Sequence, residues 1–163
     1  MTLSDDINRL SCVQLFEGFP LEQLRMLAFG SKRLFLRAGE ELYREGALSD
    51  GGYLVVSGQI DLVIFKQNRE FVLSNQLENS LIGELALITP IKRNASAVAR
   101  TNCELLHIPR ELFKRMLDEY PELAQLIHGR IQISVQQLLK QMERVHVNLE
   151  KMPNLTTSEI KQD

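Results

Sequence analysis

Glu84 and Arg93, nine positions apart, are the two residues of this sequence whose types and spacing best suit binding chemistry. Pro90 limits a helix that starts at Glu84 to one or two turns, so we expect the following loop to return Arg93 to the first helical turn. The free N–H groups of Leu85 and Ala86 and the positive end of the helix dipole would attract a phosphate, and a guanidinium can hold two of its oxygens. The segment therefore predicts an anion site.

Glu84 carries the wrong charge for direct contact with a phosphate. A carboxylate beside a phosphate is tolerable when it accepts hydrogen bonds from hydroxyl groups and when an arginine offsets both negative charges. These requirements point to a ligand with a phosphate next to a sugar, and a cyclic nucleotide has that geometry. The alternative interpretation of Glu84 and Arg93 is a structural ion pair that caps a turn.

The elements that must position this segment follow from the hydrophobic periodicity. The first thirty residues predict two short helices, broken near Gly18 and Pro20. From Lys32 to about Ile108, short β-branched and aromatic runs are separated by glycines, which predicts the strands of a barrel or a sandwich. The chain is therefore expected to combine helices with a β core.

Two features of this β region allow more detailed predictions. Ile60, Leu62 and Ile64 recur at every second position, which predicts that they share one buried strand face. The pair Ser57-Gly58 predicts a hairpin, and residues 67–69 predict another turn.

Two helices are expected after the last strand. Pro109 suits the first turn of one helix, and a second helix is predicted over about residues 121–152. Its apolar seam keeps a spacing of four and three residues and consists of Ile131, Val135, Leu138, Met142, Val145, Leu149 and Met152. A helix of about 30 residues spans about 45 Å and exceeds the width of a small domain, so we expect a symmetric homodimer. Packing of the seam on the chain's own β core is the alternative.

The composition is typical of one soluble globular domain, with 163 residues, 18.7 kDa, 44% hydrophobic and 25% charged residues. We expect this domain to cover residues 1–152 and residues 153–163 to form a disordered tail. The net charge of -2 gives no general attraction to nucleic acid or anionic lipid. A signal peptide and a long apolar stretch are both missing, which predicts a cytoplasmic protein without membrane contact.

The residue types that usually support catalysis or metal binding are sparse and scattered. Cys12 and Cys103 are isolated and are expected to be reduced. The histidines lie far apart and are His107, His128 and His146. We therefore expect no metal, no catalytic residue and no enzyme activity. Tyr43 and Tyr53 are expected in the core or at a barrel rim and not as platforms for base stacking.

The residues around the anion site resemble the phosphate-binding cassette of the cyclic nucleotide-binding domain family, which is Gly-Glu-x-small-Leu followed by Arg, one small residue and Ala. The match here is residues 83–87 followed by residues 93–95, and the resemblance extends from the helical start through Gly39-Glu40, residues 52–58 and 109–113 to the long helix. It implies an α+β fold with an antiparallel β-roll, a double-stranded β-helix or jelly-roll-like barrel. N-terminal helices and a long C-terminal dimerisation helix would flank this roll.

The resemblance also implies roles for individual residues. In the family the glutamate accepts a hydrogen bond from the ribose 2′-hydroxyl and the arginine holds the exocyclic phosphate oxygens, which gives these roles to Glu84 and Arg93. The implied ligand-binding set is Gly83, Glu84, Leu85, Ala86, Arg93, Asn94 and Ala95. The implied ligand is a 3′,5′-cyclic nucleotide, cAMP or cGMP, and no other cofactor is expected.

Two positions depart from the family pattern. Asn94 stands where the family usually has Ser, Thr, Ala or Gln, so no purine preference is predicted. Asn79 occupies the position of a glycine five residues before Glu84, where asparagine is the residue other than glycine that best tolerates a left-handed turn.

The chain is similar to the catabolite-activator type of bacterial regulator, which continues after its dimer helix into a winged helix-turn-helix. Here only residues 153–163 follow the predicted helix, and Leu138 and Leu139 stand where that activator reads adenine with hydroxyl groups, so we expect no DNA binding. The predicted function is a stand-alone, non-catalytic cyclic nucleotide sensor that dimerises and signals to a separate protein. The alternative is an interaction or structural module that keeps the fold without binding nucleotide.

Overall fold

The structure is a computed structural model that describes residues 2–151 and, in the last helix, only some of the side chains. The chain divides into two compact units, Met1–Ile127 and His128–Asp163. The first unit contains the N-terminal helices, both β-sheets and the candidate site.

The N-terminal helices form where the periodicity predicts them. They are α1 (Leu3–Ser11), a short 3₁₀ helix η1 (Gln14–Phe16) and α2 (Leu21–Gly30). A capping box between Thr2 and Asp5 starts α1. The predicted break between the helices is confirmed, because Gly18 adopts a left-handed φ of 79° and Pro20 is the N-cap of α2.

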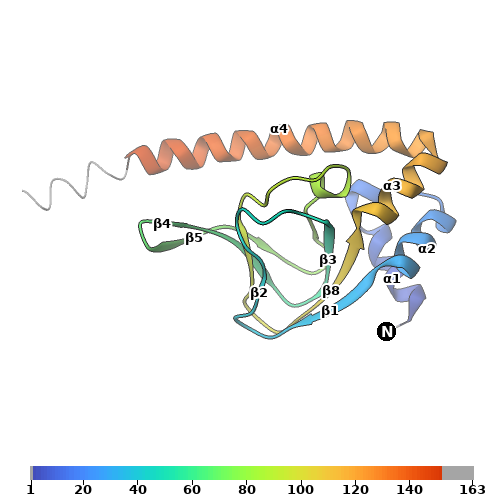
Figure 1. Ribbon diagram of the computed structural model, residues 1–163, viewed down its shortest axis with the longest axis horizontal. Coiled ribbons are helices and arrows are strands. Elements are labelled where there is room, and N and C mark those ends of the chain that lie inside the picture. Colours follow the sequence, from blue (N-terminus) through green and yellow to red (C-terminus); the bar gives the residue numbers. More distant parts are fainter. Residues whose placement is uncertain (1, 152–163) are drawn as a thin grey trace, which may run out of the picture. The chain divides into compact units, whose positions relative to one another are not determined.

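The described residues contain eight strands in two four-stranded antiparallel sheets (Figure 1). The first sheet has the order β1-β8-β3-β6, formed by Lys32–Leu36, Cys103–Pro109, Gly51–Ser57 and Leu81–Ile82. The second has the order β2-β7-β4-β5, formed by Glu41–Tyr43, Ser96–Ala99, Ile60–Lys66 and Arg69–Gln76. The predicted α+β fold with an antiparallel β-roll is confirmed. The core cluster of the roll includes Tyr53, Val55, Ile60, Ile82, Ala97, Ala99, Cys103 and Leu105.

One local prediction in the β-roll is wrong, and another is confirmed only in part. Ser57 and Gly58 do not form a hairpin, because β3 and β4 belong to different sheets and the turn carries the chain from one to the other. Ile60 and Leu62 pack in the core as predicted. A β-bulge then shifts the register of β4 against β5 between Leu62 and Val63, and beyond it Val63 is fully buried and Ile64 only partly buried. The turn at residues 67–69 is confirmed as the link between β4 and β5.

The C-terminal helices also begin where the prolines predict. Pro109 is the N-cap of α3 (Arg110–Glu119), and Pro121 is the first residue of α4 (Pro121–Lys151). The seam residues from Ile131 to Leu149 lie within α4, whereas Met152 and the expected tail lie outside the described residues. The seam side chains of Leu138, Met142, Val145 and Leu149 are also not described, so dimerisation through this helix stays a prediction.

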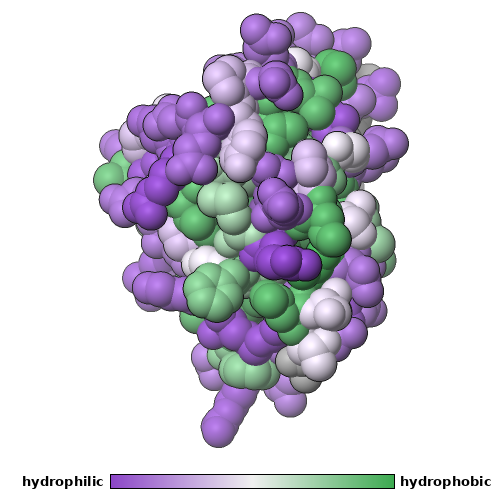
Figure 2. All heavy atoms as spheres, turned by 90° about the vertical axis from the view of Figure 1, so that its right-hand side faces the viewer, coloured by the Kyte–Doolittle hydropathy of each residue, from purple (hydrophilic) through white to green (hydrophobic). Residues whose placement is uncertain are grey.

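The surface around the N-terminal helices mixes polar and apolar side chains (Figure 2). Leu21 and Phe29 of α2 are 58% and 82% exposed. Single exposed apolar side chains are ordinary on a protein surface and need no partner to explain them. Among the described residues, no helix has the length and apolar character needed to cross a membrane.

Candidate functional site

The loop that carries Arg93 is held against the loop that precedes β3. The backbone N–H of Arg93 donates to the carbonyl of Ala47 at 2.8 Å, and the N–H of Gly46 donates to the carbonyl of Arg93 at 2.7 Å. Ser49 accepts from the N–H of Ile91 through its hydroxyl at 3.0 Å and donates its own N–H to the Ile91 carbonyl at 2.8 Å. These bonds fix the position of Arg93 through its backbone.

The Arg93 guanidinium is buried beside β2 and β3, and its side chain is only 5% exposed. Nη2 donates to the carbonyl oxygen of Gly51 at 2.9 Å. The Cζ atom lies 4.3 Å from the ring centroid of Tyr43 and 5.6 Å from that of Tyr53, both within the range of cation–π contact. The nearest carboxylate is that of Asp50, whose Oδ1 is 3.9 Å from Nη2.

This environment leaves the charge of Arg93 only partly compensated. A guanidinium has five N–H donors, and burial of a cation is unfavourable unless an anion and further hydrogen bonds compensate for the lost water. Asp50 is a weak counter-ion, because its side chain is 68% exposed and its oxygen is 3.9 Å away. The site is therefore suited to accept a second anion.

The predicted short helix follows β6 directly. It is the 3₁₀ helix η2 (Leu85–Leu87), and Gly83 before it has a φ of 83° that favours glycine. A Cβ atom at Gly83 would lie 2.6 Å from Nη1 of Arg93, so the glycine also allows the guanidinium to approach the backbone. The first N–H groups of a helix have no acceptor within the helix, which leaves donors at Leu85 and Ala86 for a ligand.

Glu84 precedes η2 and is half-buried. Within the described part of the chain its carboxylate forms no hydrogen bond or ion pair, and in particular none with Arg93. The structure thus gives no support to the alternative of a structural Glu84–Arg93 ion pair. The carboxylate is free to accept hydrogen bonds from another molecule.

The remaining predicted residues differ in their surroundings. Ala86 and Ala95 are buried, whereas Asn94 is exposed. Asn79 has a φ of 68°, which confirms the left-handed turn expected there. Its side-chain oxygen accepts a hydrogen bond from Arg9 of α1 at 3.3 Å, so the N-terminal helix contacts the turn before β6. Among the described residues, no group of three or more His, Cys, Asp or Glu residues could hold a metal ion.

An aromatic group beside Arg93 was not identified as part of the site from the sequence. Tyr43 and Tyr53 have ring centroids 6.1 Å apart, and Tyr53 also packs on His107 at 4.8 Å. Burial raises the pKa of Tyr43 to about 12 and is also the main cause of a raised pKa for Tyr53. Both rings belong to or pack against the core, as expected, but no spacing signal in the sequence indicates that they face the cassette arginine.

The start of α3 is bonded directly to the cassette. The Arg110 guanidinium donates from Nη1 to the carbonyl of Ser49 at 3.0 Å and to the carbonyl of Ala86 at 3.3 Å. Phe113 and Met116 of the same helix are fully buried. A movement of η2 would therefore change hydrogen bonds at the first residue of α3.

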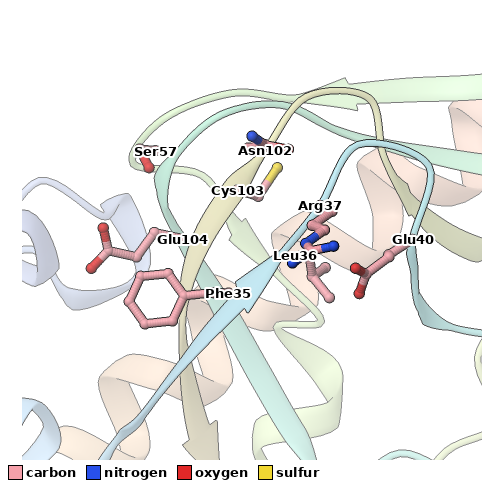
Figure 3. A pocket seen from close by; sticks show the side chains of 8 residues that line it. All are labelled: Phe35, Leu36, Arg37, Glu40, Ser57, Asn102, Cys103 and Glu104. Atoms are coloured by element: carbon pink, nitrogen blue, oxygen red, sulfur yellow. The ribbon is translucent and has the colours of Figure 1, made fainter.

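A shallow hollow of ≈ 370 Å³ lies elsewhere on the β-roll (Figure 3). Its lining is Phe35, Leu36, Arg37, Glu40, Ser57, Asn102, Cys103 and Glu104. Ser57 ends β3, whereas Gly51 beside Arg93 begins it, so the two places are about 20 Å apart along an extended strand. The hollow includes none of the predicted ligand-binding residues.

Residues 33–120 match the family model described as the cyclic nucleotide-binding domain. The chain is 34% identical over 100 residues to lysophospholipase NTE1 of Cryptococcus neoformans, a match that covers 59% of this chain and 6% of that protein. It is 30% identical over 125 residues to the human potassium/sodium hyperpolarization-activated cyclic nucleotide-gated channel 2, which covers 73% of this chain and 14% of the channel. The chain thus spans only a small part of these curated relatives.

The structure is similar to a solved cyclic nucleotide-binding-like protein from Brucella abortus, with 43% sequence identity and a TM-score of 0.65. This match covers 70% of the present chain and 98% of the solved one. A further match is the catabolite activator protein of Thermus thermophilus, at 25% identity and a TM-score of 0.68, which covers 81% of this chain and 62% of that one. The shared part is thus most of the present chain.

Proposed function

The chain belongs to the cyclic nucleotide-binding domain family, and from this premise we propose that it is a sensor that binds cAMP or cGMP through residues 83–95. The observation that carries the proposal is the buried Arg93 guanidinium, whose nearest carboxylate is the exposed Asp50 at 3.9 Å. A bound phosphate would supply the missing anion and accept the remaining in-plane N–H groups.

The proposed binding mode gives each cassette residue a separate task. Arg93 holds the exocyclic phosphate oxygens, and the N–H groups of Leu85 and Ala86 donate to the same group. Glu84 accepts from the ribose 2′-hydroxyl, for which its unpaired carboxylate is suited. Gly83 keeps the backbone close to the phosphate, while Asn94 and Ala95 follow the arginine. The protein would be non-catalytic, since these roles require binding and no bond is made or broken.

Calorimetry with cAMP and cGMP tests the proposal. We expect micromolar or tighter binding of one of them, because a helix start, a bidentate arginine and a ribose acceptor lie in one segment. A site with a Kd of 100 μM would still stabilise the fold by about 1.4 kcal/mol at 1 mM ligand. Absence of both heat and thermal shift with cAMP, cGMP and cyclic CMP at millimolar concentration would favour the alternative of a module that does not bind nucleotide.

The proposed sensor acts as a homodimer in the cytoplasm and signals to a separate protein. The apolar seam of the C-terminal helix is the proposed contact, and no DNA partner is proposed, given the net charge of -2. Light scattering should give a dimer mass for the wild type at tens of micromolar. Truncation after Arg130 should give a monomer that keeps its β-roll, and a wild-type monomer would contradict this assembly.

The proposed output passes from η2 to α3 through Arg110. Ligand binding at the cassette would shift the carbonyl of Ala86, and Arg110 connects that carbonyl to Ser49 and to the start of α3. Hydrogen exchange with saturating nucleotide should show altered protection beyond residue 109. If nucleotide changed protection only within the cassette, the binding proposal would stand, but the proposed transmission to α3 through Arg110 would be contradicted.

A further inference from the structure

Tyr43 is placed more closely against the cassette arginine than any other aromatic side chain among the described residues. It is the last residue of β2 and pairs with Ala97 of β7, the strand that follows Arg93. Its ring centroid is 4.3 Å from the Cζ atom of Arg93, against 5.6 Å for Tyr53. The strand pairing therefore fixes the ring on one side of the guanidinium.

An aromatic ring and a hydrogen-bond acceptor hold a guanidinium by different interactions. It attracts the cation through the negative face of its π-system and leaves the N–H groups unused. The hydrogen bonds of the guanidinium in the described structure are those to the carbonyl of Gly51 and with the side chain of Tyr53. The contact with Tyr43 thus restrains Arg93 while most of its donors stay available for an anion.

We infer that Tyr43 is the positioning residue of the anion site, and that its ring holds Arg93 in the orientation in which the guanidinium receives the ligand phosphate. Tyr43 acts through Arg93 and not by contact with the nucleotide. The inference rests on the proposed cyclic nucleotide binding and adds a determinant outside the cassette, fifty positions before Arg93.

The chemistry of Tyr43 agrees with a role for the ring face. Burial raises its pKa to about 12, so the phenol stays neutral at physiological pH and the ring keeps its uncharged π-system. Phenylalanine has the same ring without the hydroxyl, whereas leucine is apolar and has no π-system. The two replacements separate a positioning role of the ring from a general packing role.

Calorimetric titration with whichever of cAMP and cGMP binds the wild type provides the first readout. Tyr43→Leu should weaken affinity about five- to thirtyfold, the range that corresponds to a partly desolvated cation–π contact. Tyr43→Phe should restore affinity to within about twofold of the wild type. Tyr120→Leu, at the end of α3, is the matched control for loss of a half-buried tyrosine and should leave affinity unchanged. If Tyr43→Leu does not fold, Tyr43→Met replaces it, since methionine fills irregular gaps.

NMR of the Arg93 Nε–H group in the ligand-free chain provides the second readout. The signal should show a ring-current shift in the wild type and in Tyr43→Phe, and Tyr43→Leu should reduce the shift to the part that the more distant Tyr53 ring contributes. Wild-type binding together with equal affinity of folded Tyr43→Leu would overturn the inference and leave the proposed function standing. A wild-type chain that binds neither nucleotide would overturn the proposed function, even if the NMR shift placed the ring on Arg93.

Discussion

Arg93 and Arg100 lie on either side of β7, seven positions apart, yet their surroundings differ in kind. Arg100 is 37% exposed, and its guanidinium forms ion pairs with Asp61 of β4, at 2.6 Å, and with Glu70 of β5. Arg93 is 5% exposed and has aromatic rings and a carbonyl where Arg100 has carboxylates.

The difference separates a structural arginine from the arginine that we propose to bind the ligand. The hydrogen bonds that Arg100 donates to Asp61 and, second, to Glu70 raise the pKa of Arg100. These two carboxylates belong to β4 and β5 and compensate the charge of Arg100. The charge of Arg93 is desolvated without such compensation. Burial of a charge that is only partly compensated is unfavourable, so the surroundings of Arg93 favour an anion from outside the chain, whereas those of Arg100 do not.

The largest expected effect is the loss of nucleotide affinity in Arg93→Ala. A phosphate left without its buried partner costs about 3 to 5 kcal/mol, which corresponds to a 100-fold to several thousand-fold weaker Kd. Arg100→Ala is the matched control and should leave the Kd within about twofold, because its partners are the chain's own carboxylates. Calorimetry on both folded variants checks this, and equal losses would remove the distinction between the two arginines.

The fold could be predicted from the sequence because it depends on periodicity and on breakers of regular structure. Gly18, Pro20 and Pro109 mark helix boundaries at the places where the structure has them. The bulge at Leu62 and Val63 could not be predicted, since it depends on how β4 pairs with β5 and leaves no mark in the alternation. The chain passes from the first sheet to the second after β3. This step depends on the topology of the whole fold, so a local sequence pattern does not predict it.

The candidate site also contains residues that could be predicted from the sequence and residues that could not. Glu84 and Arg93 could be identified because both lie in one short segment with glycine and proline at informative places. Tyr43 and Asp50 reach Arg93 only through the pairing of β2 with β7 and through the loop before β3. Side chains that act through a long-range contact give no spacing signal in a single sequence.

The second largest expected effect is a loss of folding stability at alkaline pH, caused by Tyr43, whose neutral ring packs on Arg93. Tyr43 has a pKa near 12 when folded and an ordinary value of about 10 when unfolded. Between these values the unfolded chain loses a proton that the folded chain keeps, so stability falls as pH rises, by about 2 to 3 kcal/mol in total. Urea unfolding at pH 9 and pH 12 should show a smaller decline in Tyr43→Phe than in the wild type. Identical declines in the two proteins would contradict the burial of the phenol.

A third and smaller effect is expected at Glu84, whose carboxylate has no partner within the described residues. Glu84→Ala should weaken nucleotide binding by about 1.5 to 3 kcal/mol, the contribution of one hydrogen bond to a charged group. The 2′-deoxy form of the bound nucleotide should show a similar loss with the wild type and little further loss with Glu84→Ala. If the two losses of affinity added fully, Glu84 would not be the acceptor of the 2′-hydroxyl. Arg93 would then be the one cassette side chain with a proposed ligand contact.

The smallest effect tests the weak counter-ion that Arg93 does have. Asp50 lies 3.9 Å from Nη2 and is 68% exposed, so its carboxylate would repel a phosphate bound at the same guanidinium by about 1 kcal/mol in water. Asp50→Asn should therefore bind nucleotide about fivefold more tightly, and the gain should shrink as salt screens the exposed charge. Asp118→Asn, an exposed carboxylate on α3, is the control for the change in net charge. Weaker binding in Asp50→Asn would mean that Asp50 orients Arg93 as Asp61 and Glu70 orient Arg100, and the two arginines would then differ in burial alone.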